Sequence, residues 1–216
     1  MLTLGVGTAT NAPFKFTTPG TVLKTTPVTG EVEPDTNGLV YGTSTSGRGM
    51  YDQMQTMITN TNYTLTSQTA AQKIFNTSTN GAFTAQASTT YKFEVFYYVT
   101  GMSATSGTFG FTIGGTATIT SVNYTSRAQK AASVSGATTI SETMNNVVAN
   151  PTLIAANIGT AGWVRVEGHI RTNGAGTLIP QITLGIASAA VIQPNSYFRI
   201  TPIGSNTNTV IGSVFN

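Results

Sequence analysis

The feature that most constrains this chain is a period of two in its apolar residues. From residue 61 onward, short runs alternate apolar and polar side chains, and turns rich in Gly, Asn and Thr separate them. In YKFEVFYYV one face carries Tyr91, Phe93, Val95, Tyr97 and Val99, and the other carries Lys92, Glu94, Phe96 and Tyr98, so we expect both faces to be covered near the end of the strand. In GTFGFTIGG we expect Phe109, Phe111 and Ile113 to face inward. Side chains of a β-strand point alternately to its two faces, so this pattern predicts strands. Eight or nine such runs predict an all-β fold, with a jelly-roll-like β-sandwich body over residues 61–216 and almost no helix.

Charge is scarce throughout the sequence. Charged residues make up 8% of the chain, against about 25% in an ordinary soluble domain. Thr, Ser, Asn and Gly take their place, which predicts an uncharged polar surface. The Lys and Arg residues are scattered singly, so the chain lacks the basic track that a phosphate backbone needs. No window holds the roughly 20 apolar residues that span a bilayer. We therefore expect neither nucleic acid nor a membrane as a partner.

Cysteine is absent from the chain. This excludes disulfides, thiolate nucleophiles and Cys-ligated zinc. The first residues, MLTLGVGTATNAPF, have no basic segment and no long apolar run, so no signal peptide is predicted. Both observations favour folding in a reducing cytoplasm.

Residues 1–49 differ in composition from the rest, and we predict that they form a separate arm. Pro and Gly interrupt this segment every few residues, and its apolar residues come in twos and threes. Such fragments bury too little surface for a stable two-stranded ribbon. A flexible linker is one interpretation; alternating aromatic and β-branched residues favour an extended β-arm or β-prism completed by sister chains. The residues expected to pack between chains are Phe14, Phe16, Val22, Leu23, Val32, Leu39 and Tyr41.

Two local signals lie between the arm and the body. In residues 50–60, the expected connector, Met50, Met54, Met57 and Ile58 recur at helical spacing, which favours a short helix. A Met stripe of this kind is more typical of packing than of a cofactor site. Farther along, the dipeptide Asn80–Gly81 predicts a hairpin turn.

The stretch WVRVEGHIR (163–171) gathers the only Trp and the only His with two Arg and a Glu. As a strand it would place Val164, Val166, Gly168 and Ile170 toward the core, and Trp163, Arg165, Glu167, His169 and Arg171 outward. We expect Glu167 to pair with the flanking arginines, and Lys92 to pair with Glu94 on another strand.

The residues of this stretch do not meet the requirements of a known catalytic site. A hydrolytic triad needs Ser or Cys beside His with a carboxylate behind it, and a glycosidase needs two converging carboxylates. Glu94 and Glu167 would converge only by coincidence of the fold, and His169 is a lone metal ligand. No phosphate-binding, dinucleotide or zinc-protease motif occurs. The sequence therefore predicts a scaffold strand, with no catalytic, metal-binding or cofactor-binding residue and no cofactor.

Several phrases of the chain resemble bacteriophage virion and tail-fibre proteins. The opening phrases are Gly7–Thr10, Ala12–Thr17, Gly20–Leu23, Thr25–Pro27, Gly30–Glu33, Tyr41 and Ser46–Gly49, and those of the body are residues 100–120, 179–191 and 196–204. The resemblance covers nearly the whole chain. One departure is EVEPDTNG (31–38), which is longer than the usual acidic strand and Asp-Gly turn and carries Pro34.

The resemblance implies a homotrimer on the virion surface, assembled in the host cytoplasm, with a jelly-roll-like body, a threefold arm and no enzyme activity. Open strand edges need a partner, and threefold symmetry supplies one. Two functions stay open. The chain is expected to be a capsid decoration (cement) protein that braces the major capsid protein, or else a short tail or head fibre that binds a host receptor or glycan.

Overall fold

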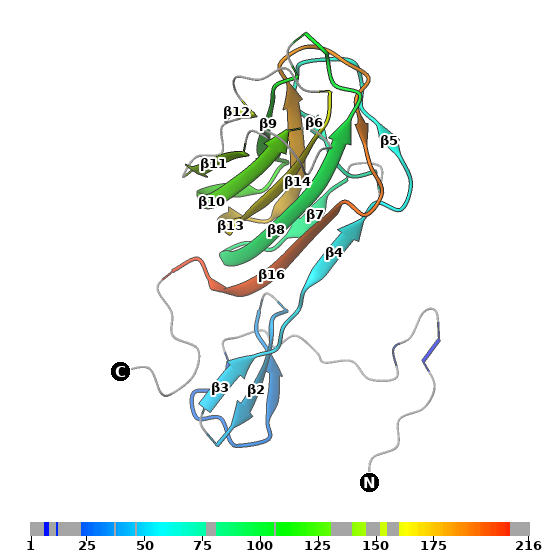
Figure 1. Cartoon of the computed structure of the whole chain (residues 1–216). Coiled ribbons are helices and arrows are strands. Elements are labelled where there is room, and N and C mark those ends of the chain that lie inside the picture. The colour runs from blue at the N-terminus through cyan, green and yellow to red at the C-terminus, as the bar shows by residue number, and fades with distance from the viewer. Residues whose placement is uncertain are drawn as a thin grey trace. The chain divides into compact units, whose positions relative to one another are not determined.

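The structure, a computed structural model, consists of two separate units and contains only strands and loops in the part of the chain it describes (Figure 1). It describes residues 7–8, 12, 23–36, 38–45, 47–76, 81–105, 107–130, 140–145, 152–154 and 160–207. The first unit covers Met1–Gln53 together with Thr209–Asn216, and the second covers Met54–Asn208. The chain is therefore all-β, with antiparallel sheets in both units.

The first unit holds a three-stranded antiparallel sheet in the order β1-β2-β3. Its strands are β1 (Val32–Pro34), β2 (Val40–Ser44) and β3 (Gly47–Met50). Asp35 closes the turn after β1: its Oδ1 accepts a hydrogen bond from the Leu39 amide at 2.8 Å, and Gly38 there adopts φ +80°. Only Leu39 and Tyr41 are buried apolar residues among the described residues of this unit.

The strands β1, β2 and β3 pair with one another within one chain. The completion of this arm by sister chains stays a prediction. Pro34 lies opposite Val40 at the end of β1, where a residue without an amide hydrogen is tolerated. Pro34 thus leaves the antiparallel pairing of β1 with β2 intact. The predicted packing residues Phe14, Phe16 and Val22 lie outside the described residues.

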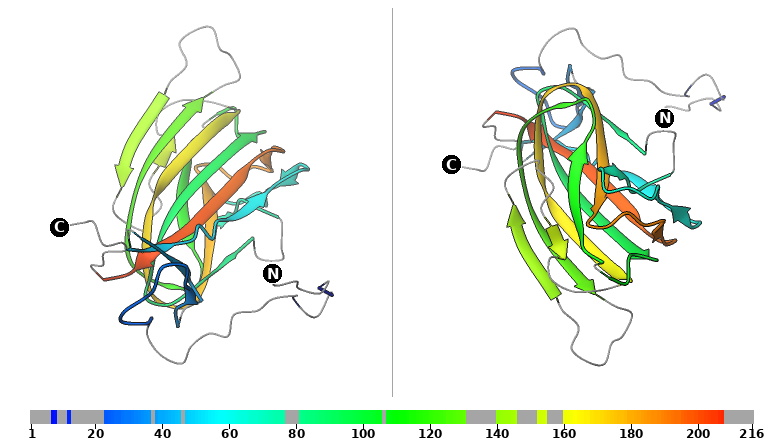
Figure 2. Two further views of the ribbon diagram at one scale, coloured as in Figure 1. Left: turned by 90° about the horizontal axis from the view of Figure 1, so that it is seen from below. Right: turned by 90° about the horizontal axis from the view of Figure 1, so that it is seen from above.

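The larger sheet of the second unit is built around β8. Its strands are β4 (Gln55–Ile58), β5 (Tyr63–Thr64), β8 (Thr89–Thr100), β10 (Thr118–Lys130), β11 (Ile140–Asn145), β13 (Gly162–Gly174), β15 (Val191–Ile192) and β16 (Tyr197–Ser205). On one side of β8 follow β13, β10 and β11; on the other side β8 pairs with β16 and then with β15. The left view of Figure 2 shows the order β11-β10-β13-β8-β16-β4 across this sheet.

A smaller sheet packs against the larger one. Its strands are β6 (Gln72–Lys73), β7 (Phe83–Ala85), β9 (Phe109–Gly114), β12 (Thr152–Ile154) and β14 (Gly176–Leu184), with β14 at the centre. Edge-on ring contacts join the sheets: Tyr97 of β8 with Phe109 of β9 at 6.3 Å, and Phe111 of β9 with Tyr124 of β10 at 5.7 Å. The core of the body lies between these two layers.

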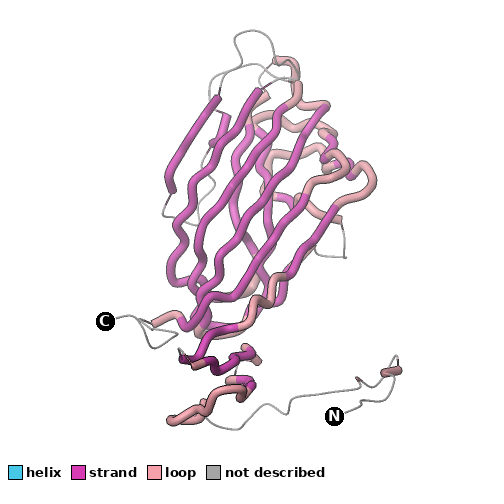
Figure 3. The backbone as a smooth tube through the Cα atoms, turned by 60° about the horizontal axis from the view of Figure 1, so that its bottom comes forward, coloured by secondary structure: helices cyan, strands magenta, loops and turns pink. Residues whose placement is uncertain are grey.

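The predicted inward faces are confirmed. All five inward residues of β8 and the three of β9 are at most 3% exposed. On β13, Val164, Val166 and Ile170 are fully buried while Arg165 and Glu167 point outward. In Figure 3 the long strands of the larger sheet run side by side, and side-chain burial also alternates along β10 and β16.

Two local predictions are wrong. Residues 55–58 form strand β4, which pairs with β16 (Met57 opposite Phe198), and not a helix. The free edge of β16 offers backbone partners along its length, and Met57 packs on the core from a strand as well as it would from a helix. The hairpin predicted at Asn80–Gly81 is not formed by the flanking strands either, because β6 and β7 each pair with β14; Asn80 itself lies outside the described residues.

Gly168 lies between Val166 and Ile170 on the inner face of β13, and its small size has a reason. A Cβ at this position would lie 2.2 Å from the Asn123 carbonyl oxygen and 2.5 Å from the Tyr124 Cβ. The glycine thus lets the backbone of β10 at Asn123 and Tyr124 approach β13 closely.

Gly168→Ala should therefore destabilise the body. We expect the free energy of unfolding to fall by about 1–3 kcal/mol, because the added methyl meets backbone that must shift. Urea unfolding followed by circular dichroism measures this. Gly49→Ala, where nothing lies within 4 Å of the added carbon, serves as the control, and equal effects of the two variants would contradict the packing argument.

Two core tyrosines bury hydroxyls that lack a hydrogen-bond partner, Tyr97 and Tyr124. Burial raises the pKa of both phenols, that of Tyr124 to about 12. The Tyr91 hydroxyl, in contrast, accepts a hydrogen bond from the Gln86 amide at 2.7 Å. Burial thus removes water from the Tyr97 and Tyr124 hydroxyls without a hydrogen bond in its place, whereas the Tyr91 hydroxyl has one.

Tyr97→Phe should raise the free energy of unfolding by about 1 kcal/mol, because it removes an unpartnered buried hydroxyl. Tyr91→Phe should lower it by about 1 kcal/mol, because the Gln86 amide loses its acceptor. The same urea titration compares the pair. A loss of stability in Tyr97→Phe as large as that in Tyr91→Phe would show that the Tyr97 hydroxyl does have a partner.

Candidate functional site

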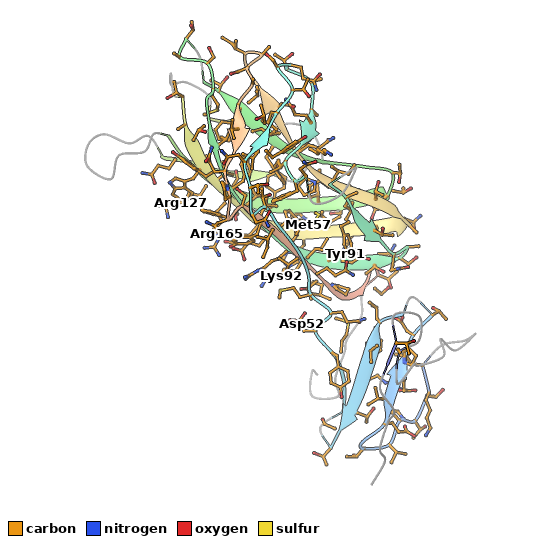
Figure 4. All side chains as sticks on the ribbon, turned by 90° about the vertical axis from the view of Figure 1, so that its right-hand side faces the viewer. Asp52, Met57, Tyr91, Lys92, Arg127 and Arg165 are labelled. Carbon is orange, nitrogen blue, oxygen red and sulfur yellow. The ribbon has the colours of Figure 1, made fainter. Side chains whose placement is uncertain are left out.

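The charged residues of the body gather on the outer face of the larger sheet. Residues 54–208 contain seven bases and three acids. Those that alternate with core residues on β8, β10, β13 and β16 are Lys92, Glu94, Arg127, Arg165, Glu167, Arg171 and Arg199. Figure 4 labels Arg127, Arg165 and Lys92, which lie along one side of the sheet. Most of the body's few charges therefore share one face.

Two rows of side chains cross this face from strand to strand. The first row consists of Arg127, Arg165, Phe96 and Tyr197, and the second of Thr125, Glu167, Glu94 and Arg199. Within the rows, Arg127 lies opposite Arg165 and Glu167 lies opposite Glu94. Like charges in opposite positions destabilise a sheet, so the ion pairs form between the rows.

Arg165 is the centre of these ion pairs. Its Nη2 lies 3.3 Å from Glu167 Oε2 and its Nε lies 3.5 Å from Glu94 Oε1. The Tyr197 hydroxyl donates a hydrogen bond of 2.5 Å to the same oxygen of Glu94. This hydrogen bond to a carboxylate raises the pKa of Tyr197. One guanidinium and one phenol thus hold both carboxylates of the rows.

Aromatic rings from three strands form an apolar floor beside these charges. The Phe96 ring lies 6.2 Å from Trp163 and 5.8 Å from Tyr197, measured between centroids. The Trp163 Nε1 donates to Gln129 at 2.9 Å, which fixes the indole. The Arg199 guanidinium lies 4.9 Å from the Tyr197 ring centroid, a cation–π distance.

These rows and rings line a groove of about 1020 Å³. Its lining residues are Glu94, Phe96, Thr125, Ser126, Arg127, Trp163, Arg165, Glu167, Tyr197 and Arg199. The groove offers guanidinium donors, carboxylate acceptors and an apolar floor within one hollow, which is the composition of a ligand-binding site. We name it the outer groove.

The carboxylates of the outer groove are held in ion pairs. Glu94 and Glu167 are both bonded to Arg165. His169 lies one position farther along β13, opposite Lys92 and Asn123, and among the described residues no carboxylate is paired with it. In the part of the chain that the structure describes, no group of three or more His, Cys, Asp or Glu residues is placed to hold a metal ion.

The predicted outward face of β13 is confirmed, but its partners differ from those predicted. Among the described ion pairs, Glu167 pairs with Arg165 alone of its two neighbouring arginines, and Glu94 pairs with Arg165 and not with Lys92. The sequence analysis missed Phe96, Tyr197 and Arg199 as members of the same site. Their outward positions follow from alternation, yet only strand pairing places them beside β13.

The predicted arm residues fall into three groups. Leu39 and Tyr41 are buried within the first unit, Leu23 is half-buried, and Val32 is 37% exposed. The Tyr41 hydroxyl donates to Asp35 Oδ2 at 3.3 Å. Burial and then the Asp35 charge raise the pKa of Tyr41 to about 12.

Ion pairs neutralise the first unit locally. Glu33 lies 2.7 Å from Arg48, with both side chains largely buried, and Glu31 lies 2.5 Å from Lys24. Arg48 Nη2 also donates to the Lys24 carbonyl at 2.6 Å, so the segment before β1 is tied to β3.

Comparison with known proteins gives no match: no family model, no curated protein and no solved structure matches this chain. Among the described residues no helix is long and apolar enough to cross a membrane.

The ion pairs of the outer groove should add little to stability. The Arg165 side chain is 52% exposed and Glu167 is 54% exposed, and exposed pairs are worth about 0–1 kcal/mol. Arg165→Gln is therefore expected to lower the free energy of unfolding by less than about 1 kcal/mol, measured by urea unfolding. A loss of more than about 2 kcal/mol would mean that the groove residues serve the fold itself.

Proposed function

We propose that this chain is a non-enzymatic structural protein of a virion surface. In this proposal it is a homotrimer with a jelly-roll-like body, assembled in the host cytoplasm, that decorates the capsid and braces the major capsid protein. The resemblance of phrases in both arm and body to phage virion proteins supports this identity, as does the all-β architecture.

The observation that carries the proposal is the very small buried apolar core in the described part of the first unit. Its three strands have 3, 5 and 4 residues, and its described part buries only Leu39 and Tyr41 as apolar residues. Val28 is 59% exposed and Val32 is 37% exposed. A three-stranded sheet this small needs further packing to be stable. Sister chains or the capsid shell would supply it.

The charges of the first unit fit the same function. The local pairs Glu33–Arg48 and Glu31–Lys24 leave little uncompensated charge on the sheet. Identical copies could then approach one another around a threefold axis without strong like-charge repulsion. Phe14, Phe16, Val22 and Leu23 would add apolar surface to these contacts.

Removal of the exposed valines tests the proposal in the full-length chain. The double variant Val28→Ser and Val32→Ser should weaken trimer formation and capsid binding at least tenfold, because a buried Val contributes about 1.5–3 kcal/mol. Light scattering gives the mass, and co-sedimentation with capsids gives binding. Ile186→Ser, in the body and 39% exposed, is the control and should change neither.

Two results would contradict the proposal. A wild-type chain that is a monodisperse monomer would exclude the trimer. A chain lacking residues 1–48 that still coats capsids would exclude the arm as the anchor, provided that its body remains folded by circular dichroism.

A second function is favoured by the outer groove. In this alternative the chain is a short tail or head fibre, and the groove contacts a host surface receptor or glycan. Antibody labelling of intact virions separates the two: a decoration protein should cover the shell in many copies, whereas a fibre should label a few sites.

A further inference from the structure

We propose that the outer groove binds an oligosaccharide that carries carboxylates, of the uronic or sialic acid class. The inference names the ligand class for the groove of the second function, and it rests on that function in one respect, namely that the groove binds a ligand. It concerns the body alone and is independent of whether the protein lies on the capsid or on a fibre.

The charges of the groove are not required by the fold. Five of the ten charged residues between 54 and 208 line this single hollow. They include two pairs of like charges in opposite register positions, Arg127 with Arg165 and Glu94 with Glu167. Such neighbours weaken a sheet, and exposed ion pairs return little stability. We therefore attribute this concentration of charge to the binding of a ligand.

The balance of charge in the groove selects an anionic ligand. Arg127, Arg165 and Arg199 face two carboxylates, and both carboxylates are bonded to Arg165. Among the described ion pairs Arg199 takes part in none; its guanidinium lies over the Tyr197 ring. A guanidinium held in this way keeps its planar set of donors for a carboxylate of the ligand.

The floor of the groove fits sugar rings. Trp163, Phe96 and Tyr197 come from the adjacent strands β13, β8 and β16, so the floor is about 10 Å long at the usual strand spacing of ~4.8 Å. A pyranose ring has an apolar C–H face and a rim of hydroxyls, and about two such rings would cover this floor. The hydroxyls would bond to Glu94, Glu167 and Thr125 at its edge.

The volume and the lining residues of the groove argue against a protein as its occupant. Its volume of about 1020 Å³ lies at the upper end of the range for small-ligand pockets, about 300–1000 Å³. Glu is depleted in protein interfaces, whereas Glu94 and Glu167 both line this groove. A second copy of the chain is therefore the less suitable occupant.

The test uses the full-length protein on an array of uronic-acid and sialic-acid oligosaccharides, with neutral oligosaccharides of the same length beside them. We expect binding to carboxylated glycans only, weakened by 0.5 M NaCl because the guanidinium–carboxylate contact is screened. Arg199→Gln and Trp163→Ala should each reduce this binding at least tenfold. Arg171→Gln, the same change on the same face but outside the groove, should leave it unchanged.

Each contrary outcome overturns the inference. These outcomes are no binding to any carboxylated glycan, equal binding to neutral glycans, or equal effects of Arg199→Gln and Arg171→Gln. Circular dichroism melting checks that each variant is folded. If Arg199→Gln lowers the mass seen by light scattering, the groove holds a second copy and not a glycan. The trimer and capsid assays of the arm are separate measurements, so failure here leaves the proposed virion function untouched.

Discussion

The pairing of β8 with β13 over eleven residue pairs governs both faces of the body. Val95 lies opposite Val166 in the core, and the adjacent positions Glu94 and Glu167 lie opposite each other outside. A shift of one residue would move the apolar set into water and the charges into the core. The core therefore holds the register, and the register brings two carboxylates together on the outer face, where Arg165 and Tyr197 bond to them.

Because of this register, the residues that stabilise the body and those proposed to bind a ligand lie on opposite faces of the larger sheet. The inner face carries rings and aliphatic side chains that contact one another across two layers, as Tyr97 and Phe109 do. The outer face carries exposed charges that the core does not need. Residues of the outer groove can thus follow the demands of a ligand, while the strands beneath them remain fixed by the packing on the other side. The proposed glycan site depends on this division.

The first unit follows a different principle. It balances its charges through Glu33–Arg48 and Glu31–Lys24, and its described part buries Leu39 and Tyr41 while Val28 and Val32 remain in water. Hydrogen bonds give this sheet its local order, but its apolar surface is incomplete. A partner surface that covers those residues would supply the missing packing, which is why the proposed trimer and capsid contacts are assigned to this unit.

The sequence by itself determined the all-β class and the face of each long strand, because a period of two follows from backbone geometry and needs no partner. It placed Phe109 and Val95 inward and Arg165 outward correctly. It did not determine strand partners: the Met-rich segment at 54–58 became an edge strand because β16 offered unpaired backbone groups, which helical spacing cannot reveal. The outer groove likewise forms only when the chain folds. Tyr197 and Glu94 are 103 residues apart in the chain, and only the tertiary pairing of their strands, set by the shared core, brings hydroxyl and carboxylate into contact.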